Sequence, residues 1–180
     1  MKRLGALLLP LCLLLAGCGK NVAAGRYEAF SEALRARNDL SFTAEVRAEY
    51  PERTARFTLA YADEDPGCSL TVTEPEAIRG VTVHLNGAES ALGYDSVILD
   101  TGPLDRCGLS PVTAVEKLAG ALREGHLESA WEEDGRPVWE LIADDGLTVR
   151  VFLNENLIPV RAELISEGRV AVFCDILDWK

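Results

Sequence analysis

Few residues in this 180-residue chain have the type and spacing of a catalytic centre. Its two histidines, His84 and His126, are far apart in the sequence, and neither lies in a motif with a nucleophile or an acid. A catalytic triad needs a nucleophile, a base and an orienting group in one constellation. The sequence therefore predicts that both histidines are surface or strand-end residues. We expect no catalytic residue and no enzyme activity.

Acidic residues are abundant, and three clusters of them suggest calcium at first sight: Asp63-Glu64-Asp65, Glu132-Glu133-Asp134 and Asp144-Asp145. None has the regular ligand spacing of an EF-hand loop. Asp134-Gly135 and Asp145-Gly146 are explained as hairpin turns, because Asp followed by Gly favours a tight turn. We interpret the clusters as solvated turns and predict no metal and no cofactor. Glycosidases use two carboxylates at a defined separation, and the mere abundance of acidic residues does not indicate such a pair.

Cys18 lies in a sequence motif that suggests a covalent modification. Met1-Lys2-Arg3 and the leucine-rich run 4–15 resemble the basic and apolar regions of a secretory signal, and the run is too short to span about 30 Å of hydrocarbon. Leu15-Ala16-Gly17-Cys18 then looks like a bacterial lipobox, in which the thiol receives a diacylglyceryl group and becomes mature residue one. The sequence predicts a signal peptide at 1–17 and lipidation of Cys18. The alternative is an ordinary cleaved signal with a free cysteine.

The other cysteines show no metal motif. Cys12 lies in the predicted signal, and Cys68, Cys107 and Cys174 remain without CxxC or His–Cys spacing. Outside the cytoplasm, one disulfide with one thiol left over is one interpretation. Three buried free cysteines are the other, because cysteine also packs as a small apolar residue.

Charge excludes one class of partner. Loss of Lys2 and Arg3 with the signal changes the formal charge from −11 to −13. A protein this acidic is repelled by phosphate backbones, so we expect no nucleic-acid partner. Anionic headgroups repel it too, and membrane attachment then depends on the lipid, for which two acyl chains suffice. We expect an extracytoplasmic location, anchored to the cell membrane through lipidated Cys18.

Apolar periodicity predicts two helices. The first is 26–37, where Tyr27, Phe30 and Leu34 recur at helical spacing, after a short, small and polar tether that completes the segment 18–25. The second is Pro111–Glu124, because Ser110 is a favourable N-cap, Pro111 suits the first helical position and Gly125 suits the stop.

Period-two alternation predicts an antiparallel sheet, with one apolar face and one wet face on its first hairpin. Turn residues separate the strands, among them Asn86-Gly87 and Glu167-Gly168. Pro103–Gly108 is predicted to be a loop. The predicted strands are 40–50, 55–61, 68–73, 81–85, about 90–99, 127–132, 136–143, 147–153, 158–166 and 169–179.

These elements predict an α+β fold in one domain, residues 26–180. About ten strands at roughly 4.8 Å spacing make a sheet near 48 Å across, and two helices about 10 Å wide cover less than half of its apolar face. The sheet must therefore curl. We expect a curved antiparallel sheet, a half-open β-barrel, with the two helices packed over its concave side.

This order of elements resembles the superfamily of LolA, LolB, the RseB N-terminal domain and LppX-type lipoproteins. The segment Val72–Val81, with Pro75-Glu76-Ala77-Ile78-Arg79-Gly80, is similar to a stretch in many Gram-positive relatives, as is the helix start Leu109-Ser110-Pro111. The resemblance covers most of Tyr27 to Trp179. It implies a LolA-like domain that is not an enzyme and that binds acyl chains or lipoproteins, or acts as an envelope adaptor like clostridial GerS, which spore-cortex amidase activity requires.

The apolar stripes of the early strands supply the predicted ligand-binding residues. A half-open barrel leaves an apolar hollow of the kind in which apolar ligands bind. Aromatic residues gather in the last third of the chain, where core packing is the default and a rim around the cleft is the alternative: Trp131, Trp139, Phe152, Phe173 and Trp179. The residues expected to line the hollow are Phe42, Val46, Phe57, Leu59, Val83 and Leu85.

Two function hypotheses follow. The first is a membrane-anchored, non-catalytic envelope lipoprotein that binds a lipid or a lipoprotein acyl chain in the half-barrel. The second is a protein–protein adaptor, for instance a GerS-like partner of a cell-wall or cortex amidase in sporulation or germination, which uses its acidic outer face or an exposed strand edge.

Overall fold

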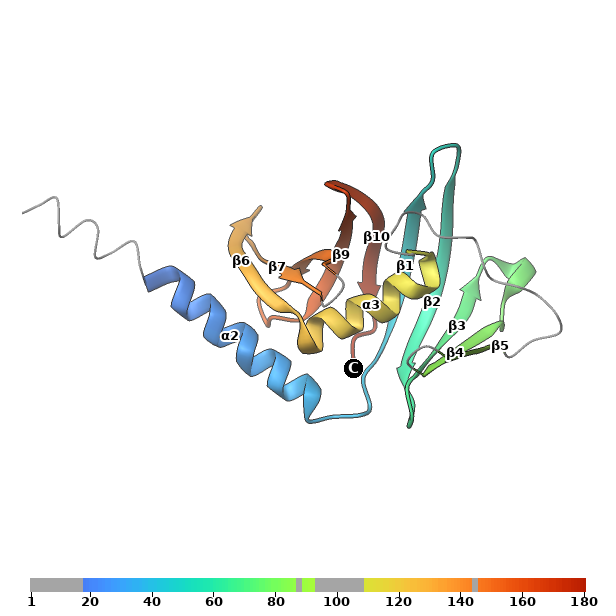
Figure 1. Cartoon of the computed structure of the whole chain (residues 1–180), viewed down its shortest axis with the longest axis horizontal. Helices are drawn as coiled ribbons and strands as arrows, with labels where there is room; N and C mark the ends of the chain where they lie inside the picture. The colour runs from blue at the N-terminus through green and yellow to red at the C-terminus, as the bar shows by residue number, and fades with distance from the viewer. Residues whose placement is uncertain (1–17, 87–88, 93–108, 144–145) are drawn as a thin grey trace, which may run out of the picture.

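The computed structural model describes residues 18–86, 89–92, 109–143 and 146–180 (Figure 1). It contains two α-helices, one short 3₁₀ helix and ten strands within these ranges. The elements are α2 (Cys18–Arg35), β1 (Ser41–Glu49), β2 (Thr54–Asp63), β3 (Cys68–Glu74), η1 (Glu76–Ile78), β4 (Thr82–Asn86), β5 (Glu89–Leu92), α3 (Pro111–Glu124), β6 (His126–Glu133), β7 (Arg136–Ile142), β8 (Thr148–Leu153), β9 (Pro159–Ser166) and β10 (Arg169–Leu177).

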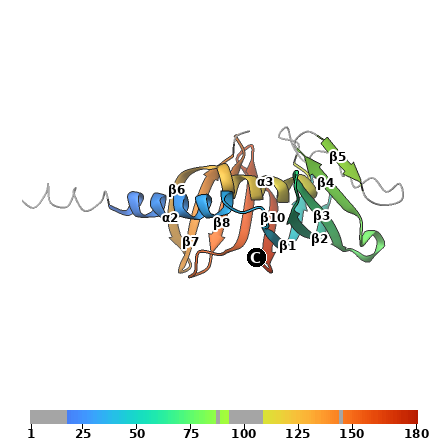
Figure 2. The ribbon, with the colours of Figure 1, turned by 90° about the horizontal axis from the view of Figure 1, so that it is seen from below.

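All ten strands belong to one antiparallel sheet with the order β5-β4-β3-β2-β1-β10-β9-β8-β7-β6. The first and last strands of the chain, β1 and β10, pair in the middle of this order, so each half of the sheet is a run of consecutive hairpins. The sheet curves around α3 and its two end strands do not meet, while α2 crosses the β6 end (Figures 1 and 2). The expected α+β half-barrel with helices on the concave side is confirmed.

Helix α2 begins earlier than the sequence predicts. It covers Cys18–Arg35, so residues 19–25, expected as a tether, are helical, and the predicted last residues 36–37 are not part of it. Ala23 and Ala24 explain the extension, because alanine is the best helix former. An interior glycine such as Gly25 costs only about 1 kcal/mol there, which the packing of the following turns offsets.

Helix α3 has the predicted bounds. Ser110 is its N-cap: its Oγ accepts a hydrogen bond from the Thr113 N–H at 3.2 Å, and the Thr113 hydroxyl accepts one from the Ser110 N–H at 2.8 Å. This reciprocal pair satisfies two donors that the helix would otherwise leave open. Val115, Leu118 and Leu122 are fully buried, so the apolar stripe faces the sheet.

The hairpin turns use the conformations their residues favour. Asp134 and Gly135 both have positive φ, 50° and 74°, and Glu167 and Gly168 have 51° and 77°. Two consecutive residues with positive φ match the right-handed twist of the flanking strands. The 3₁₀ turn η1 was not predicted. Part of the predicted strand 90–99, all of the predicted loop 103–108, and Gly87 of the predicted turn lie outside the described residues.

The core fills the concave side of the sheet. Alternate residues of β1 and β2 point to it, and Phe42, Val46 and Leu59 are at most 3% exposed. Across the described ranges, neither helix is long and apolar enough to cross a membrane.

Candidate functional site between the helices and the concave face

The residues predicted to line an apolar hollow lie on the concave face. Register places Val46 opposite Phe57, and Leu59 and Phe42 face the same side because side chains alternate along a strand. Val83 and Leu85 lie opposite Leu70 and Cys68 on β3, which are core residues. Phe42, Val46, Leu59 and Val83 are buried, whereas Phe57 and Leu85 are partly buried against the core.

Aromatic side chains occupy part of this concave space. The Phe42 ring stacks on Tyr61 and on Trp179, with ring centroids 4.9 Å and 5.2 Å apart. Phe30 of α2 lies 5.3 Å from Trp139, edge to face, and 6.4 Å from Trp179. These contacts connect α2 to β7 and to the segment after β10, both in the β10–β6 half of the sheet. A ligand would therefore have to displace side chains or a helix to reach the predicted lining residues.

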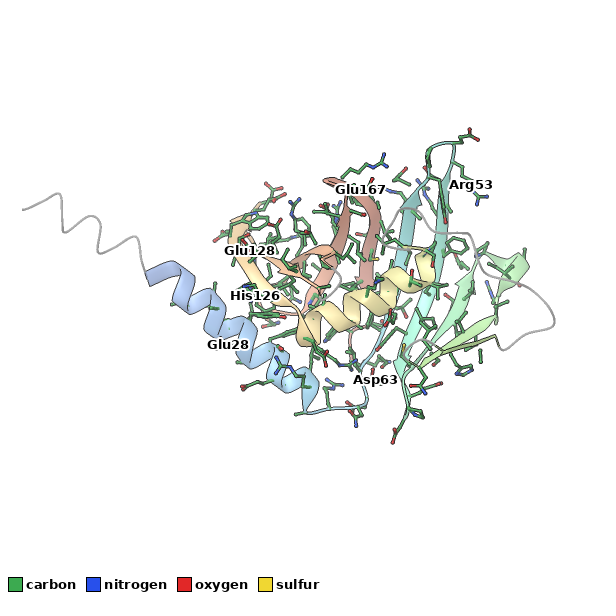
Figure 3. All side chains as sticks on the ribbon, viewed as in Figure 1. Glu28, Arg53, Asp63, His126, Glu128 and Glu167 are labelled. Atoms are coloured by element: carbon green, nitrogen blue, oxygen red, sulfur yellow. The ribbon has the colours of Figure 1, made fainter. Side chains whose placement is uncertain are left out.

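Helix α3 is attached to β2 by an ion pair near its C-terminal end. The Arg123 guanidinium donates to the Asp63 carboxylate, with Nη2 2.5 Å from Oδ2, and to the Tyr61 hydroxyl at 3.3 Å. Tyr61 in turn donates to Asp63 at 2.9 Å. We call these three residues the latch. Figure 3 shows Asp63 at the end of β2 that lies toward α2 and the end of α3.

Burial makes the latch more sensitive to the loss of one partner than a surface ion pair is. The Asp63 side chain is only 6% exposed, and its Oδ2 also accepts a hydrogen bond from the Leu40 N–H at 2.9 Å. Removing one partner of such a pair leaves the other as an unpaired buried charge, which is strongly destabilising. Burial lowers the pKa of Arg123, but its hydrogen bonds to Asp63 and Tyr61 raise that pKa by more, so it lies above its usual value. Burial also raises the pKa of the Tyr61 hydroxyl.

Helix α2 is attached to the same end of α3. The Tyr27 hydroxyl donates to the carbonyl oxygens of Ala121 at 3.1 Å and Gly125 at 2.6 Å. The Ser31 hydroxyl and Arg35 Nε both donate to the Arg123 carbonyl, the latter at 2.8 Å. The Ala121 carbonyl also accepts the Gly125 N–H, but the Arg123 carbonyl lies in the last turn, where helix carbonyls lack an intrahelical partner. Ser31 and Arg35 therefore satisfy a group that would otherwise need water. One end of α3 thus holds both α2 and β2.

The residues considered for catalysis or metal binding do not converge. Exposed His84 bonds through Nδ1 to Glu64 at 2.7 Å, and that bond lowers the pKa of Glu64. His126 is exposed at the start of β6, near Glu128 (Figure 3). Within the described ranges no three His, Cys, Asp or Glu side chains are placed to hold a metal ion. Asp63 belongs to the latch, and Asp144-Asp145 lies outside the described residues.

Two of the three remaining cysteines are placed by the structure. Cys68 and Cys174 are buried free thiols, and Cys107 lies outside the described residues. Burial raises the pKa of the Cys68 thiol to about 11 and that of the Cys174 thiol to about 12. A thiol that stays protonated is a poor nucleophile and a poor metal ligand.

The aromatic residues of the last third divide between the two faces. Trp139 is buried in the core, and Trp179 follows β10 rather than lying in it, partly buried. Trp131, Phe152 and Phe173 lie on the outer, convex face instead of at a concave rim. Each has an arginine over its ring, at 5.4 Å for Arg150 over Trp131 and 4.1 Å for Arg47 over Phe173.

No protein-family model matches the chain, and no curated protein matches it. Several solved structures are similar to it. A LolA superfamily protein from Nitrosomonas europaea is 16% identical over 87% of this chain and 92% of that chain, with a TM-score of 0.46. A putative outer membrane lipoprotein-sorting protein domain from Vibrio parahaemolyticus is 13% identical over 86% and 92%, with a TM-score of 0.42. LprF from Mycobacterium bovis is 9% identical over 88% and 93%, with a TM-score of 0.34. These similarities concern the fold alone.

Proposed function

We propose that this chain is a non-catalytic envelope lipoprotein that takes an apolar ligand, a lipid or a lipoprotein acyl chain, between α3 and the concave face. The observation that carries the proposal is the apolar contact between α3 and the concave face, where Val115, Leu118 and Leu122 are fully buried. Polar contacts to α2 and β2 are made by residues 121–125 of the same helix and its cap. Movement of α3 away from the sheet would break these contacts and uncover the apolar face.

Energetics restrict the ligand to a long chain. Exposing Val115, Leu118 and Leu122 costs roughly 1.5–3 kcal/mol each, about 6 kcal/mol in total. Each buried methylene of a ligand returns about 0.8 kcal/mol, so roughly eight methylenes are needed to offset the opening. Long acyl chains meet this condition and short ones do not.

Lipidation of Cys18 would bring the site close to its ligand source. Cys18 is the first residue of α2, and the same helix donates hydrogen bonds to the end of α3. A diacylglyceryl group at this position would hold α2, and with it the opening, at an extracytoplasmic membrane surface. Two acyl chains are sufficient for stable attachment against the repulsion of an acidic protein.

A titration with fluorescent fatty acids of different chain length tests the proposal. We expect delipidated protein to bind a sixteen-carbon probe with micromolar or better affinity, and an eight-carbon probe at least tenfold more weakly. A Leu59→Gln variant, which puts an amide on the concave face, should weaken binding at least fivefold. Circular dichroism would check that it folds, and an exposed control, Arg169→Gln, should leave binding unchanged. Equal affinity for both chain lengths, or no binding, would overturn the proposal.

The latch provides a second check of the same opening. The double variant Asp63→Asn with Arg123→Gln removes both charges, which avoids leaving one of them buried alone. We expect it to bind the sixteen-carbon probe faster and at least threefold more tightly in stopped-flow fluorescence, because α3 opens more easily. Unchanged binding rates in this variant would show that α3 does not gate the concave face.

A further inference from the structure

The convex face carries two rows of charged and aromatic side chains that run across the strands. In one row Arg161, Asp175, Glu45, Thr58 and Glu74 are successive partners from β9 to β3. In the parallel row Phe173, Arg47 and Arg56 are successive partners from β10 to β2. Glu45 and Arg47 lie two residues apart on β1, so the rows are about 7 Å apart. The first row is acidic over β10, β1 and β3, and the second is basic and aromatic.

Aromatic stacking and ion pairs hold the arginines of this face in place. Arg47 lies over the Phe173 ring at 4.1 Å, and its Nε is 3.0 Å from a Glu49 carboxylate oxygen. Arg161 lies 5.7 Å from the same ring and forms an ion pair with Glu163 at 3.1 Å. A stacked guanidinium keeps its edge free for a carboxylate. Arg47 is therefore held in place before any partner arrives.

Two pairs of like charges lie directly opposite each other within these rows. Glu45 faces Asp175 on β10, and Arg47 faces Arg56 on β2. Directly opposite residues have Cβ atoms only about 5 Å apart, and like charges there are destabilising. Asp175 also lies opposite Arg161 on β9, which offsets part of the first repulsion, whereas Arg56 forms no ion pair with any described residue. The contact between Arg47 and Arg56 is therefore one that folding alone does not favour.

A groove of about 530 Å³ lies along these rows, lined among others by Arg161, Phe173, Asp175, Arg47, Arg56 and Glu74. Its lining residues come from β9, β10, β1, β2 and β3, which are consecutive in the sheet (Figure 1), and from Pro75 just after β3. Five strands at about 4.8 Å spacing span about 19 Å, the length of roughly six extended residues. The shape therefore fits an extended polypeptide better than a compact small molecule.

The geometry points to a docking groove for an extended segment of a partner protein, with basic side chains along one edge and acidic side chains along the other. Successive side chains of an extended segment point to opposite sides. The basic ones would meet Glu45, Asp175 and Glu74, and the acidic ones would meet Arg47 and Arg56. A purely anionic polymer is disfavoured by the acidic row and by the net charge of −11. The charged side chains of this interface lie on the face opposite to the proposed lipid site.

Two labelled peptides of identical composition test the groove. Both are hexapeptides with blocked ends, one with alternating Lys-Glu-Lys-Glu-Lys-Glu and one with the block order Lys-Lys-Lys-Glu-Glu-Glu. Only the alternating peptide segregates the two signs onto opposite edges when extended. In fluorescence anisotropy with the full chain in detergent, we expect the alternating peptide to bind at least tenfold more tightly. Equal affinities would overturn the inference, because composition and net charge would then explain the binding.

Matched variants locate the binding. The pair Arg47→Gln with Arg56→Gln, and separately the pair Glu45→Gln with Asp175→Asn, should each weaken binding of the alternating peptide at least fivefold. The control pair Glu132→Gln with Arg136→Gln, on the distant β6–β7 hairpin, should change it less than twofold. All variants should keep wild-type circular dichroism and fatty-acid binding. Loss of binding in the control pair, or tighter binding of hexaglutamate than of the alternating peptide, would overturn the inference.

Discussion

At the scale of single residues, the structure separates ionisable groups that are exposed from groups that burial keeps neutral. Cys174 lies in the core beneath the pairing of β1 with β10, and its pKa is raised to about 12. Burial also raises the pKa of Tyr61, a latch residue, and that of Cys68 beside it. The latch itself could not be predicted from the sequence. Arg123 and Asp63 are 60 positions apart, and a lone charged residue in an amphipathic helix has the same pattern whether it is solvated or paired.

Alkaline pH should destabilise the fold through these raised groups. An unfolded thiol has a pKa near 8.5, whereas these buried groups have a higher pKa in the folded state. As the pH rises from the unfolded value toward the folded value, the unfolded chain ionises first, so the folded state loses stability. We expect the free energy of unfolding, measured by urea titration, to fall steadily between about pH 9 and pH 12. Cys174→Ala should be less stable at pH 8 but lose less stability over that interval. An equal loss of stability in the wild type and in Cys174→Ala would contradict the raised pKa of Cys174.

At the scale of elements, strand positions were predictable because alternation along a strand is a local property. The 26–37 helix was predicted at the wrong start, since Val22-Ala23-Ala24 is too short to show a period by itself. The concave positions of Phe42, Val46 and Leu59 followed from the same alternation. The alternation does not show which outward-facing residues on different strands become neighbours. The predicted first hairpin already pairs β1 with β2, but Arg47 meets Phe173 only through the pairing of β1 with β10, which the sequence pattern does not contain.

The N-cap of α3 is a test at this scale. Ser110→Ala removes the acceptor for the Thr113 N–H and half of the capping box. We expect it to lower the free energy of unfolding by about 1 kcal/mol, the usual value for such a cap. Chemical denaturation measures the change. Ser110→Asp, which keeps an acceptor at the cap, should remain within a few tenths of a kcal/mol of the wild type.

Removing the like-charge pair Arg47–Arg56 on β1 and β2 is expected to stabilise the protein rather than destabilise it. Arg56→Thr removes the repulsion from Arg47 and places a β-branched residue on the strand. We expect the variant to be more stable by roughly 0.5 kcal/mol, within the range for cross-strand pairs. The same denaturation experiment at low and high salt should show the gain shrinking as salt screens the charges. A variant less stable than the wild type would mean that the two arginines are not in conflict.

At the scale of the whole molecule, the two faces of one sheet carry separate proposals. The concave face is covered by α2 and α3 and supports the proposed acyl-chain site. The convex face carries the proposed peptide groove with its two rows of charged and aromatic side chains. The half-barrel was predictable because ten strands expose more apolar area than two helices cover. The degree to which side chains fill the concave space was not, because it depends on rings from α2, β1 and the segment after β10 meeting in space.

The central pairing of β1 with β10 has a consequence for biogenesis. Ser41 and Lys180 exchange backbone hydrogen bonds in both directions, so the two halves of the sheet join along a seam that involves the final residues of the printed sequence. During synthesis, β1 to β5 are made long before β10, the partner of β1 at this seam. Until synthesis reaches residues 169–177, β1 is an edge strand whose unpaired backbone N–H and C=O groups can pair with another chain.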